Sequence, residues 1–395
     1  MELRTIQNAN AEARILGQID PADLALKNPE NWSLDFLKLV LTQYQFLQKL
    51  APKLPEWAEN QKIIGGENVN IEQSSSELTA RYKFSQYRGK RAADLTGGFG
   101  IDTYFLSKKF EMVDYCEPNP DLFEVVKYNF HSLGVSNVNF HCRTAEDFLN
   151  QNSEKFDLIY LDPDRRSEKS SKLVLIEDCR PNLTDIQDTL LHFSSKVLIK
   201  YSPLLDIKLA LKTLKKTVNI KVLAVKNDVK ELLFEVSSSS DIEDISLSTV
   251  NLSGEDIQDF EFRLMEEENA TVAYSEPLNY LYEPNAAIMK SGAFKAVGKR
   301  FGLAKIAQHS HFYTSEKLVK DFPGRIFKVE ESTTAAGKAL KKWKNTKVNV
   351  ISRNYPLKPE TLRQKYRLND GSDEFLIFTT DYKNEKILIT CTRNL

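Results

Sequence analysis

The chain has 395 residues, more than the ~100–200 residues of one ordinary domain, so more than one folded unit is expected. Its 41% hydrophobic and 28% charged residues are typical of a globular protein and exclude a disordered or collagen-like chain. The formal net charge of −1, from 54 basic and 55 acidic residues, taken alone indicates no nucleic acid or membrane partner.

The four cysteines stand far apart without a C-x-x-C pair, and the five histidines show no metal-ligand spacing. We therefore expect a reduced, cytoplasmic protein without a metal site. The N-terminus carries charges where a signal peptide needs an apolar segment, and nowhere do eighteen apolar residues follow one another. Neither secretion nor membrane insertion is expected.

Residues 1–72 are predicted to form a helical domain. Asp20 followed by Pro21 is typical of a helix start. Ser33 can cap a longer helix, in which apolar residues recur every three or four positions. Pro52 and Pro55 are expected to end that helix.

From about Ala92, short β-rich runs alternate with helical segments. Strands joined by crossovers of a dozen or more residues predict a doubly wound, Rossmann-like α/β domain over 73–237 with a mainly parallel sheet. The last two of seven strands are close enough for a hairpin, so the last one is predicted antiparallel. The predicted strands are 92–95, 112–116, 137–141, 157–161, 196–201, 219–225 and 231–237, and the main predicted helices are 101–109, 121–133, 182–193 and 205–214.

Beyond the sheet, an acidic α+β linking unit is predicted over 238–279 and a small basic α+β domain over 280–395. Residues 227–285 hold fifteen acids against two bases, whereas residues 290–365 hold eighteen Lys or Arg against five acids. The net charge of −1 therefore results because two oppositely charged segments cancel, and it does not argue against a nucleic acid partner.

The strongest local signal is ADLTGGFGIDT, which follows the first predicted strand and opens a helix. Such a turn brings backbone N–H groups and a helix N-terminus close to a nucleotide-like ligand. The dinucleotide fingerprint has a third glycine where Thr103 stands here, which favours S-adenosylmethionine over an NAD-type cofactor. The candidate contacts are Asp94, Thr96, Gly97, Gly98, Phe99 and Gly100.

Two further segments are predicted to complete the cofactor site. A carboxylate at the tip of the second strand suits the two ribose hydroxyls, because it accepts two hydrogen bonds at once. Residues after the third strand are candidates for framing the adenine ring, although Thr144 is equally explained as the N-cap of the next helix. The candidates in these segments are Glu117, Pro118, Asn119, Thr144, Ala145 and Glu146.

A second signal, FDLIYLDPDRR, ends the fourth strand, where open α/β sheets bind ligands. The carboxylate of Asp162 can accept a hydrogen bond from an amine about to be methylated, and it also borders the cofactor. A pair of guanidinium groups suits phosphate or carboxylate recognition. The alternative is a plain strand-ending Asp-Pro turn. The predicted catalytic residues are Asp162, Pro163, Asp164, Arg165 and Arg166.

The predicted substrate contacts lie in two other segments. Lys200 and Tyr201 end the fifth strand on the same rim, and Tyr201 is either a base-stacking ring or a core residue. The segment SSSELTARYKF precedes the first strand and either folds over the methionine end of the cofactor or forms a solvated helix. Its candidate contacts are Glu77, Thr79 and Arg81.

These motifs resemble a known family. DLTGGFG, Glu117 and LDPDRR make residues 91–205 similar to class I S-adenosylmethionine-dependent methyltransferases. With EQSSSELTARYKF, KYSPLLDI, YLYEPNAAIMKSGAF and VISRNYP, the chain resembles more closely a bacterial group that carries a C-terminal THUMP-like domain. The resemblance implies S-adenosyl-L-methionine as the cofactor and RNA, either tRNA or rRNA, as the substrate. LDPDRR departs from the amine-methylating pattern N/D-P-P-Y/F at Asp164 and Arg165, so the methylated atom stays open.

In the basic region, Lys and Arg alternate with Phe301, Tyr313 and Trp343. Phosphates take up such charges and bases stack on such rings, so the pattern favours RNA over a merely solvated face. We therefore expect a cytoplasmic RNA methyltransferase. The alternatives are a methyltransferase acting on a small molecule or a protein, and a non-enzymatic RNA-binding protein with a vestigial cofactor pocket.

Overall fold

The computed structural model describes residues 2–28, 30–66, 71–72, 74–165, 176–238, 244–254, 256–334 and 336–393. The chain divides into two compact units, Met1–Val218 with Leu233–Ile242, and Asn219–Leu232 with Glu243–Leu395. The four segments expected from the sequence therefore do not correspond to four separate units. No helix in the described ranges is both long enough and apolar enough to cross a membrane.

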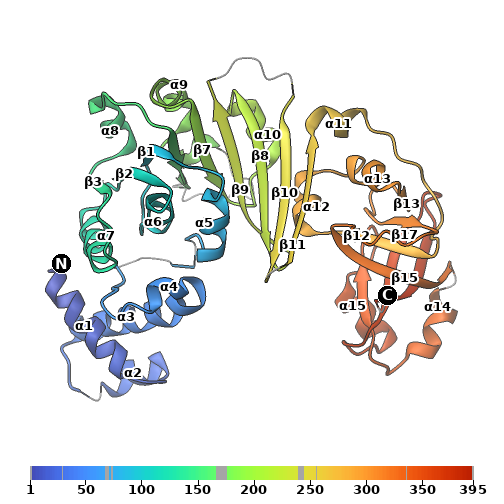
Figure 1. The fold of residues 1–395 in the computed structure, drawn as a ribbon. Helices are drawn as coiled ribbons and strands as arrows, with labels where there is room; N and C mark the ends of the chain where they lie inside the picture. The colour runs from blue at the N-terminus through green and yellow to red at the C-terminus, as the bar shows by residue number, and fades with distance from the viewer. Residues whose placement is uncertain are drawn as a thin grey trace. The chain divides into compact units, whose positions relative to one another are not determined.

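Most helices of the first unit (Figure 1) begin at a residue whose side chain caps the first turn. The side chain of Asp20 accepts the Ala22 N–H at 2.8 Å, and Ser33 accepts the Phe36 N–H at 3.3 Å, which confirms both predicted starts. Pro52 lies inside the last turn of its helix instead of ending it. The helical elements are α1 (Leu3–Ile15), α2 (Pro21–Lys27), α3 (Leu34–Lys53), α4 (Pro55–Ala58), α5 (Glu77–Phe84), α6 (Ile101–Ser107), α7 (Pro120–Ser132), α8 (Ala145–Gln151), the 3-10 turn η1 (Ile176–Asp178), α9 (Leu183–Phe193) and α10 (Ile207–Thr213).

The predicted α/β fold is confirmed, with a nine-stranded sheet in the order β11-β10-β8-β9-β7-β4-β1-β2-β3. The central pairs β1 with β2, β2 with β3, β1 with β4 and β4 with β7 are parallel. The strands are β1 (Gly89–Asp94), β2 (Phe110–Cys116), β3 (Val138–His141), β4 (Leu158–Leu161), β7 (Lys196–Tyr201), β8 (Thr217–Val225), β9 (Asp228–Ser237), β10 (Ser246–Ser253) and β11 (Asp256–Arg263).

The sheet has nine strands, two more than the seven expected from the sequence. Strand β10 pairs in parallel with β8, and β11 pairs antiparallel with β10, so the segment expected to be a linking unit adds strands to the sheet. In β11 only Phe260 and Phe262 are buried, and three of its five exposed positions are acids, which gave the segment the composition of a linker. Strands β8 and β9 are joined by Lys226 and Asn227, whose positive φ angles of 51° and 63° are typical of a two-residue hairpin turn.

The N-terminal helices share a hydrophobic core with the sheet. Trp57 of α4 is fully buried, and its ring lies 5.6 Å from Phe99, 5.4 Å from Tyr104 and 6.2 Å from Phe130. Aromatic groups in such edge or tilted contacts stabilise a fold beyond the burial of their area. This shared core explains why residue 72 is not a boundary between compact units.

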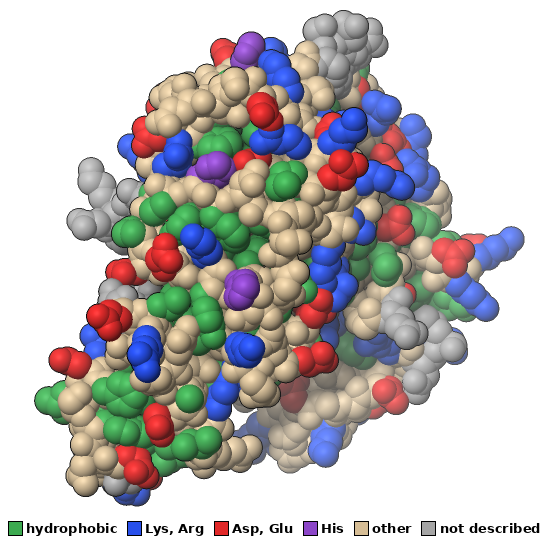
Figure 2. Space-filling view, turned by 60° about the vertical axis from the view of Figure 1, so that its left-hand side comes forward, with side chains coloured by type: hydrophobic (Ala, Val, Ile, Leu, Met, Phe, Trp, Pro, Cys, Tyr) green, Lys and Arg blue, Asp and Glu red, His purple; other side chains and the backbone are tan. Residues whose placement is uncertain are grey.

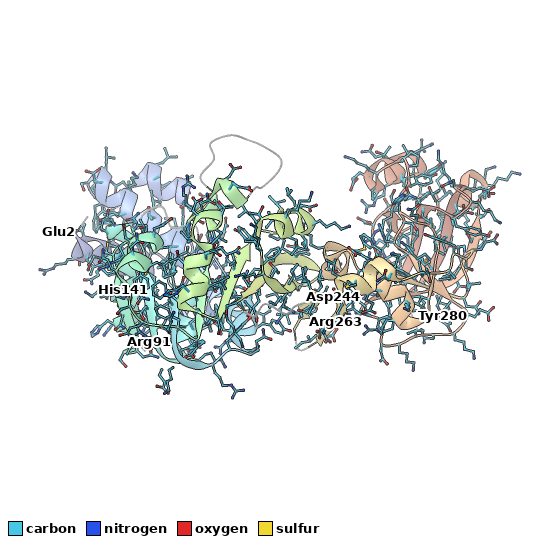
Figure 3. All side chains as sticks on the ribbon, turned by 90° about the horizontal axis from the view of Figure 1, so that it is seen from above. Glu2, Arg91, His141, Asp244, Arg263 and Tyr280 are labelled. Carbon is cyan, nitrogen blue, oxygen red and sulfur yellow. The ribbon has the colours of Figure 1, made fainter. Side chains whose placement is uncertain are left out.

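A polar cluster around the buried Asp114 links the first three strands of the sheet. The carboxylate of Asp114 in β2 accepts hydrogen bonds from Arg91 in β1 at 2.7 Å and contacts His141 in β3 at 2.8 Å. Figure 3 labels Arg91 and His141 in this part of the molecule. Burial acts to raise the pKa of Asp114, but His141 and Arg91 outweigh it and hold the pKa below its usual value.

The second unit contains a seven-stranded sheet in the order β13-β14-β12-β15-β18-β17-β16. Its strands are β12 (Tyr280–Pro284), β13 (Ala304–Lys305), β14 (Tyr313–Ser315), β15 (Gly324–Thr333), β16 (Asn349–Ser352), β17 (Glu374–Thr380) and β18 (Lys386–Thr392). Its helical elements are α11 (Leu264–Asn269), α12 (Ala286–Ser291), α13 (Ala296–Phe301), α14 (Ala336–Ala339), the 3-10 turn η2 (Leu340–Trp343) and α15 (Pro359–Tyr366).

Acids of the second unit pair with its bases. Glu283, whose side chain is 3% exposed, contacts Arg353 at 2.6 Å and also pairs with Arg325. On the surface, Glu266 lies 3.1 Å from Arg300. Over the face shown in Figure 2, which carries the first unit, acidic and basic side chains are likewise interspersed. The acidic segment therefore neutralises part of the basic one within the same unit.

Candidate active site

A cavity of about 550 Å³ lies at the carboxyl ends of β1 to β4, where open parallel sheets bind their ligands. Four loops that follow these strands supply most of its lining. Every residue predicted to hold a cofactor lines it, namely Asp94, Thr96, Gly97, Gly98, Phe99, Gly100, Glu117, Pro118, Asn119, Thr144, Ala145, Glu146 and Asp162. The structure thus brings these separate segments to one place.

The glycines of the turn are required by packing. A Cβ atom on Gly97 would lie 2.1 Å from the ring of Tyr115, and one on Gly100 would lie 2.7 Å from Phe130. Gly98 has a φ of 50°, which favours glycine. The Tyr115 hydroxyl donates to the Gly98 carbonyl at 2.7 Å. The turn is therefore shaped by the strand and helix beneath it.

The backbone amides of the turn mostly donate within the chain, whereas the sequence suggested that they would meet a ligand. Because these amides already donate hydrogen bonds, the turn does not present the free N–H groups of a phosphate-binding loop. The contacts are Thr96 N–H to Asp94 Oδ1 at 3.2 Å, Gly97 N–H to the Cys116 carbonyl at 2.8 Å, Gly98 N–H to Glu117 Oε2 at 3.1 Å and Gly100 N–H to the Gly97 carbonyl at 2.8 Å.

Glu117 is held by the loops around it. Its Oε1 accepts the Asn119 N–H at 2.8 Å and its Oε2 accepts the Gly98 N–H. Each carboxylate oxygen can accept more than one hydrogen bond, so the fixed group suits a pair of hydroxyls. On the neighbouring wall, Thr144 accepts the Asp147 N–H at 3.1 Å and also lines the cavity, so capping the helix and framing a ligand are compatible.

Two carboxyl groups lie at the strand ends, Asp94 fully buried and Asp162 partly buried. Asp94 is fully buried and accepts the Thr103 hydroxyl at 2.6 Å. Burial raises the pKa of Asp94 to about 7 despite that bond. Asp162 donates its N–H to Thr96 Oγ1 at 2.5 Å, and its carboxylate lies 2.6 Å from Lys200 Nζ. Burial also raises the pKa of Asp162, and Lys200 acts in the opposite direction.

A buried network behind the cavity was not found by sequence reasoning. The ammonium of Lys83 in α5 donates to Asp102 at 2.9 Å, to Ser75 at 2.9 Å and to the Tyr160 hydroxyl at 3.1 Å. Burial acts to raise the pKa of Asp102, but Lys83 and Lys200 outweigh it and lower the pKa. Lys83 lies in SSSELTARYKF and Asp102 in ADLTGGFGIDT, but no rule of sequence spacing predicts that the two side chains meet.

Several predicted residues lie elsewhere. Glu77 and Arg81 pair with each other at 2.9 Å, and Arg81 also contacts Glu56 at 2.6 Å, so they tie α5 to α4 and do not line the cavity. Thr79 belongs to the capping box of α5. Tyr201 is only 4% exposed and packs against Phe234, so it is a core residue and offers no face for stacking.

Only some residues of the LDPDRR segment line the cavity. Asp162 and Asp164 line the cavity, whereas Pro163 is buried and is not among the lining residues. Arg165 belongs to β5 (Asp164–Arg165), which pairs with β6 (Cys179–Arg180), and Arg166 lies outside the described residues. This pairing brings Arg180, which the sequence analysis did not identify, to the cavity wall with Pro181.

Comparisons with known proteins agree with this fold. Family models match a ferredoxin-like domain at residues 280–323 and a THUMP domain-like unit at residues 324–393. The crystal structure of a proposed methyltransferase from Porphyromonas gingivalis W83 is 32% identical, covers 100% of both chains and superposes with a TM-score of 0.89. The chain therefore belongs to the same family, which joins a methyltransferase fold to a C-terminal THUMP-like domain.

More distant structures resemble only part of the chain. A proposed methyltransferase from Streptococcus mutans in complex with SAH, SMU.1697c, is 17% identical over 41% of this chain and 96% of its own, with a TM-score of 0.31. An rRNA methylase from Streptococcus thermophilus is 13% identical over 41% and 96%, with a TM-score of 0.32. Scores this low carry no argument about function. Among curated proteins, none matches the chain.

Proposed function

We propose that this protein is an S-adenosyl-L-methionine-dependent methyltransferase that modifies a base in tRNA or rRNA. The observation that carries the proposal is the cavity at the strand ends, in which Glu117 is fixed by the Gly98 and Asn119 amides. A fixed carboxylate at the end of the second strand suits the two hydroxyls of a ribose.

The charges of the lining fit this cofactor. Among the residues that the structure describes, its acidic side chains are Asp94, Asp102, Glu117, Glu146, Asp162 and Asp164, and its basic one is Arg180. S-adenosylmethionine carries a sulfonium and an ammonium group, which an acidic wall favours over the pyrophosphate of a dinucleotide. The glycine turn also favours S-adenosylmethionine over a dinucleotide, because most of its amides donate within the chain and do not form a phosphate-binding loop.

Asp162 is the proposed group that orients the acceptor and holds its proton. Lys200 positions this carboxylate through their 2.6 Å contact, and the Thr96 hydroxyl fixes its backbone. The cofactor supplies a methyl group already activated on sulfur, so proximity and alignment are what the protein must add. No second activating group is needed for such a transfer.

An exposed lysine cluster in the second unit supports RNA as the substrate. We call Lys338, Lys341, Lys342, Lys344 and Lys347 the lysine cluster; all are exposed, and they lie in or next to α14 and η2. Lys342 Nζ lies 5.4 Å from the ring centre of Trp343. Cationic groups beside a large ring suit a phosphate backbone with unstacked bases.

The decisive experiment is mass spectrometry of modified nucleosides in RNA from a deletion strain and its parent. We expect one methylated nucleoside to disappear and to return when the wild-type gene is supplied. The Asp162→Asn variant should not restore it, although it should bind S-adenosylhomocysteine as tightly as the wild type in calorimetry. Asp188→Asn, an exposed change on α9, is the matched control and should restore it.

Other outcomes would replace the proposal. Unchanged RNA nucleosides with intact cofactor binding would favour a small-molecule or protein substrate. Folded protein that binds no S-adenosylmethionine at millimolar concentration would favour a non-enzymatic RNA-binding role. Full restoration by Asp162→Asn would remove Asp162 from the transfer step.

A further inference from the structure

The basic groups around the cavity are unequally available to a ligand. Lys83 and Lys200 lie behind the acidic wall, and each is engaged with a carboxylate, Lys83 with Asp102 at 2.9 Å and Lys200 with Asp162 at 2.6 Å. Arg180 is instead part of the lining and is an exposed residue. Among the described residues it is therefore the lining group that can offer a positive charge to a ligand.

The position of Arg180 is fixed by backbone pairing. Strands β5 and β6 form a two-stranded antiparallel ribbon in which Asp164 is opposite Arg180. Both residues line the cavity, so the ribbon places Arg180 on the wall that also carries Asp162. Its recorded hydrogen bond is a long one, from Nη1 to the Cys179 carbonyl at 3.4 Å. None of the ion pairs found among the described residues includes it.

The proposed cofactor has one anionic group, the carboxylate of its methionine part. An acidic wall repels that group, and the bonded amides of the glycine turn do not receive it. A guanidinium matches a carboxylate in a planar, bidentate fork. We infer that Arg180 binds the carboxylate of the cofactor's amino-acid moiety and thereby selects for ligands that carry it; this inference rests on the proposed function.

The test compares two nucleosides that differ in this moiety. S-adenosylhomocysteine has the amino-acid carboxylate, whereas 5′-methylthioadenosine lacks the whole amino-acid part. In calorimetry, Arg180→Ala should weaken binding of S-adenosylhomocysteine about tenfold or more, the usual effect of losing a charge-assisted hydrogen bond. Binding of 5′-methylthioadenosine should change less than about twofold. Arg180→Lys should recover part of the loss, because it restores the charge without the fork.

Controls separate this result from misfolding and from a different ligand. Arg88→Ala removes an exposed arginine of the same unit that does not line the cavity, and it should bind both nucleosides like the wild type. Equal weakening of both nucleosides by Arg180→Ala, or no weakening of S-adenosylhomocysteine, would overturn the inference while leaving the cofactor assignment intact. If only the KM for RNA rose, Arg180 would bind an acceptor phosphate instead. Wild-type protein that binds neither nucleoside would overturn the proposed function itself.

Discussion

At the scale of single residues, the site combines acids with different surroundings. Asp94 has a pKa of about 7 because it is buried, whereas Asp102 has a lowered pKa because two lysines outweigh its burial. A carboxyl group that must lose its proton while buried costs the folded state free energy. The cofactor site is therefore built from groups that do not all favour folding.

This cost gives Asp94 a defined effect on stability. Below about pH 4 the carboxyl is protonated in both the folded and the unfolded chain, so it costs nothing. Between about pH 4 and pH 7 the unfolded chain ionises first, so stability falls as the pH rises. Above pH 7 the full cost is on the order of 4 kcal/mol.

We expect Asp94→Asn to raise the free energy of unfolding at pH 8 and to lose this advantage near pH 4. The amide can still accept the Thr96 N–H and donate to the Thr103 hydroxyl, so the geometry is preserved. Denaturant titrations at both pH values measure the difference. A gain that is the same at pH 4 and pH 8 would contradict the raised pKa.

The sequence predicted the cavity lining better than the groups around it. Asp94, Glu117 and Asp162 were found because each lies at the last residue of a strand or directly after it, and parallel strands bring their carboxyl ends to one edge. Lys83 and Arg180 were missed because tertiary packing, through α5 and through the β5–β6 ribbon, places them. Tyr201 was ambiguous because aromatic residues at strand ends occur both in cores and in sites.

At the scale of elements, α5 and α6 are joined through one buried charge pair. The two helices pack together (Figure 1), and the fully buried side chain of Lys83 reaches Asp102 and Tyr160. Removing one partner of such a pair leaves the other charge buried and uncompensated. The first turn of α6 carries Asp102 to the cavity wall, so this pair also sets the shape of the site.

We expect Lys83→Met to lower the free energy of unfolding by about 3–5 kcal/mol. The double variant Lys83→Met/Asp102→Asn should be more stable than the single variant, because it removes the orphaned charge. Arg81→Met is the control on the same helix; its partly exposed ion pairs should be worth no more than about 1 kcal/mol. A double variant no more stable than Lys83→Met would show that the charge pair is not the cause.

The elements themselves were predicted unevenly. Strands β4 and β7 contain short, buried, mostly apolar runs, which sequence patterns detect well, whereas β1 buries only its last three residues. Strand β10 contains serines and strand β11 contains acids, and only the pairing of β10 with β8 and of β11 with β10 identifies them as part of the sheet. Acids and serines are also common in linkers that do not fold, so the sequence alone does not distinguish these strands from a linker.

At the scale of the whole molecule, the opposite charges of neighbouring segments are partly neutralised within the second unit. Glu266 pairs with Arg300, Glu276 with Lys383, and Glu283 with Arg325 and Arg353. Within the lysine cluster, the recorded ion pair is a 3.7 Å contact between Lys342 and Glu331. Within the described residues the other four lysines of the cluster form no ion pair, so the cluster keeps most of its positive charge for a polyanion.

We expect the triple variant Lys341→Gln/Lys342→Gln/Lys344→Gln to weaken RNA binding and to make it less sensitive to salt. Each phosphate contact contributes about 0.7–0.9 to the slope of log K against log salt, so three should lower the slope by about 2–3. Lys208→Gln/Lys212→Gln/Lys215→Gln removes three exposed lysines from the first unit as the control. Equal effects of the two triple variants would show that the lysine cluster has no special role.

The close approach of Gly97 to the Tyr115 ring also limits how this site can evolve. A side chain at position 97 has no room while Tyr115 is present, and Tyr115 in turn holds the Gly98 carbonyl through its hydroxyl. Replacement of Gly97 during evolution would first require a residue smaller than Tyr at position 115. That change would remove the hydrogen bond that holds the Gly98 carbonyl. Positions 97 and 115 should therefore change together among relatives, and an isolated change at either should be rare.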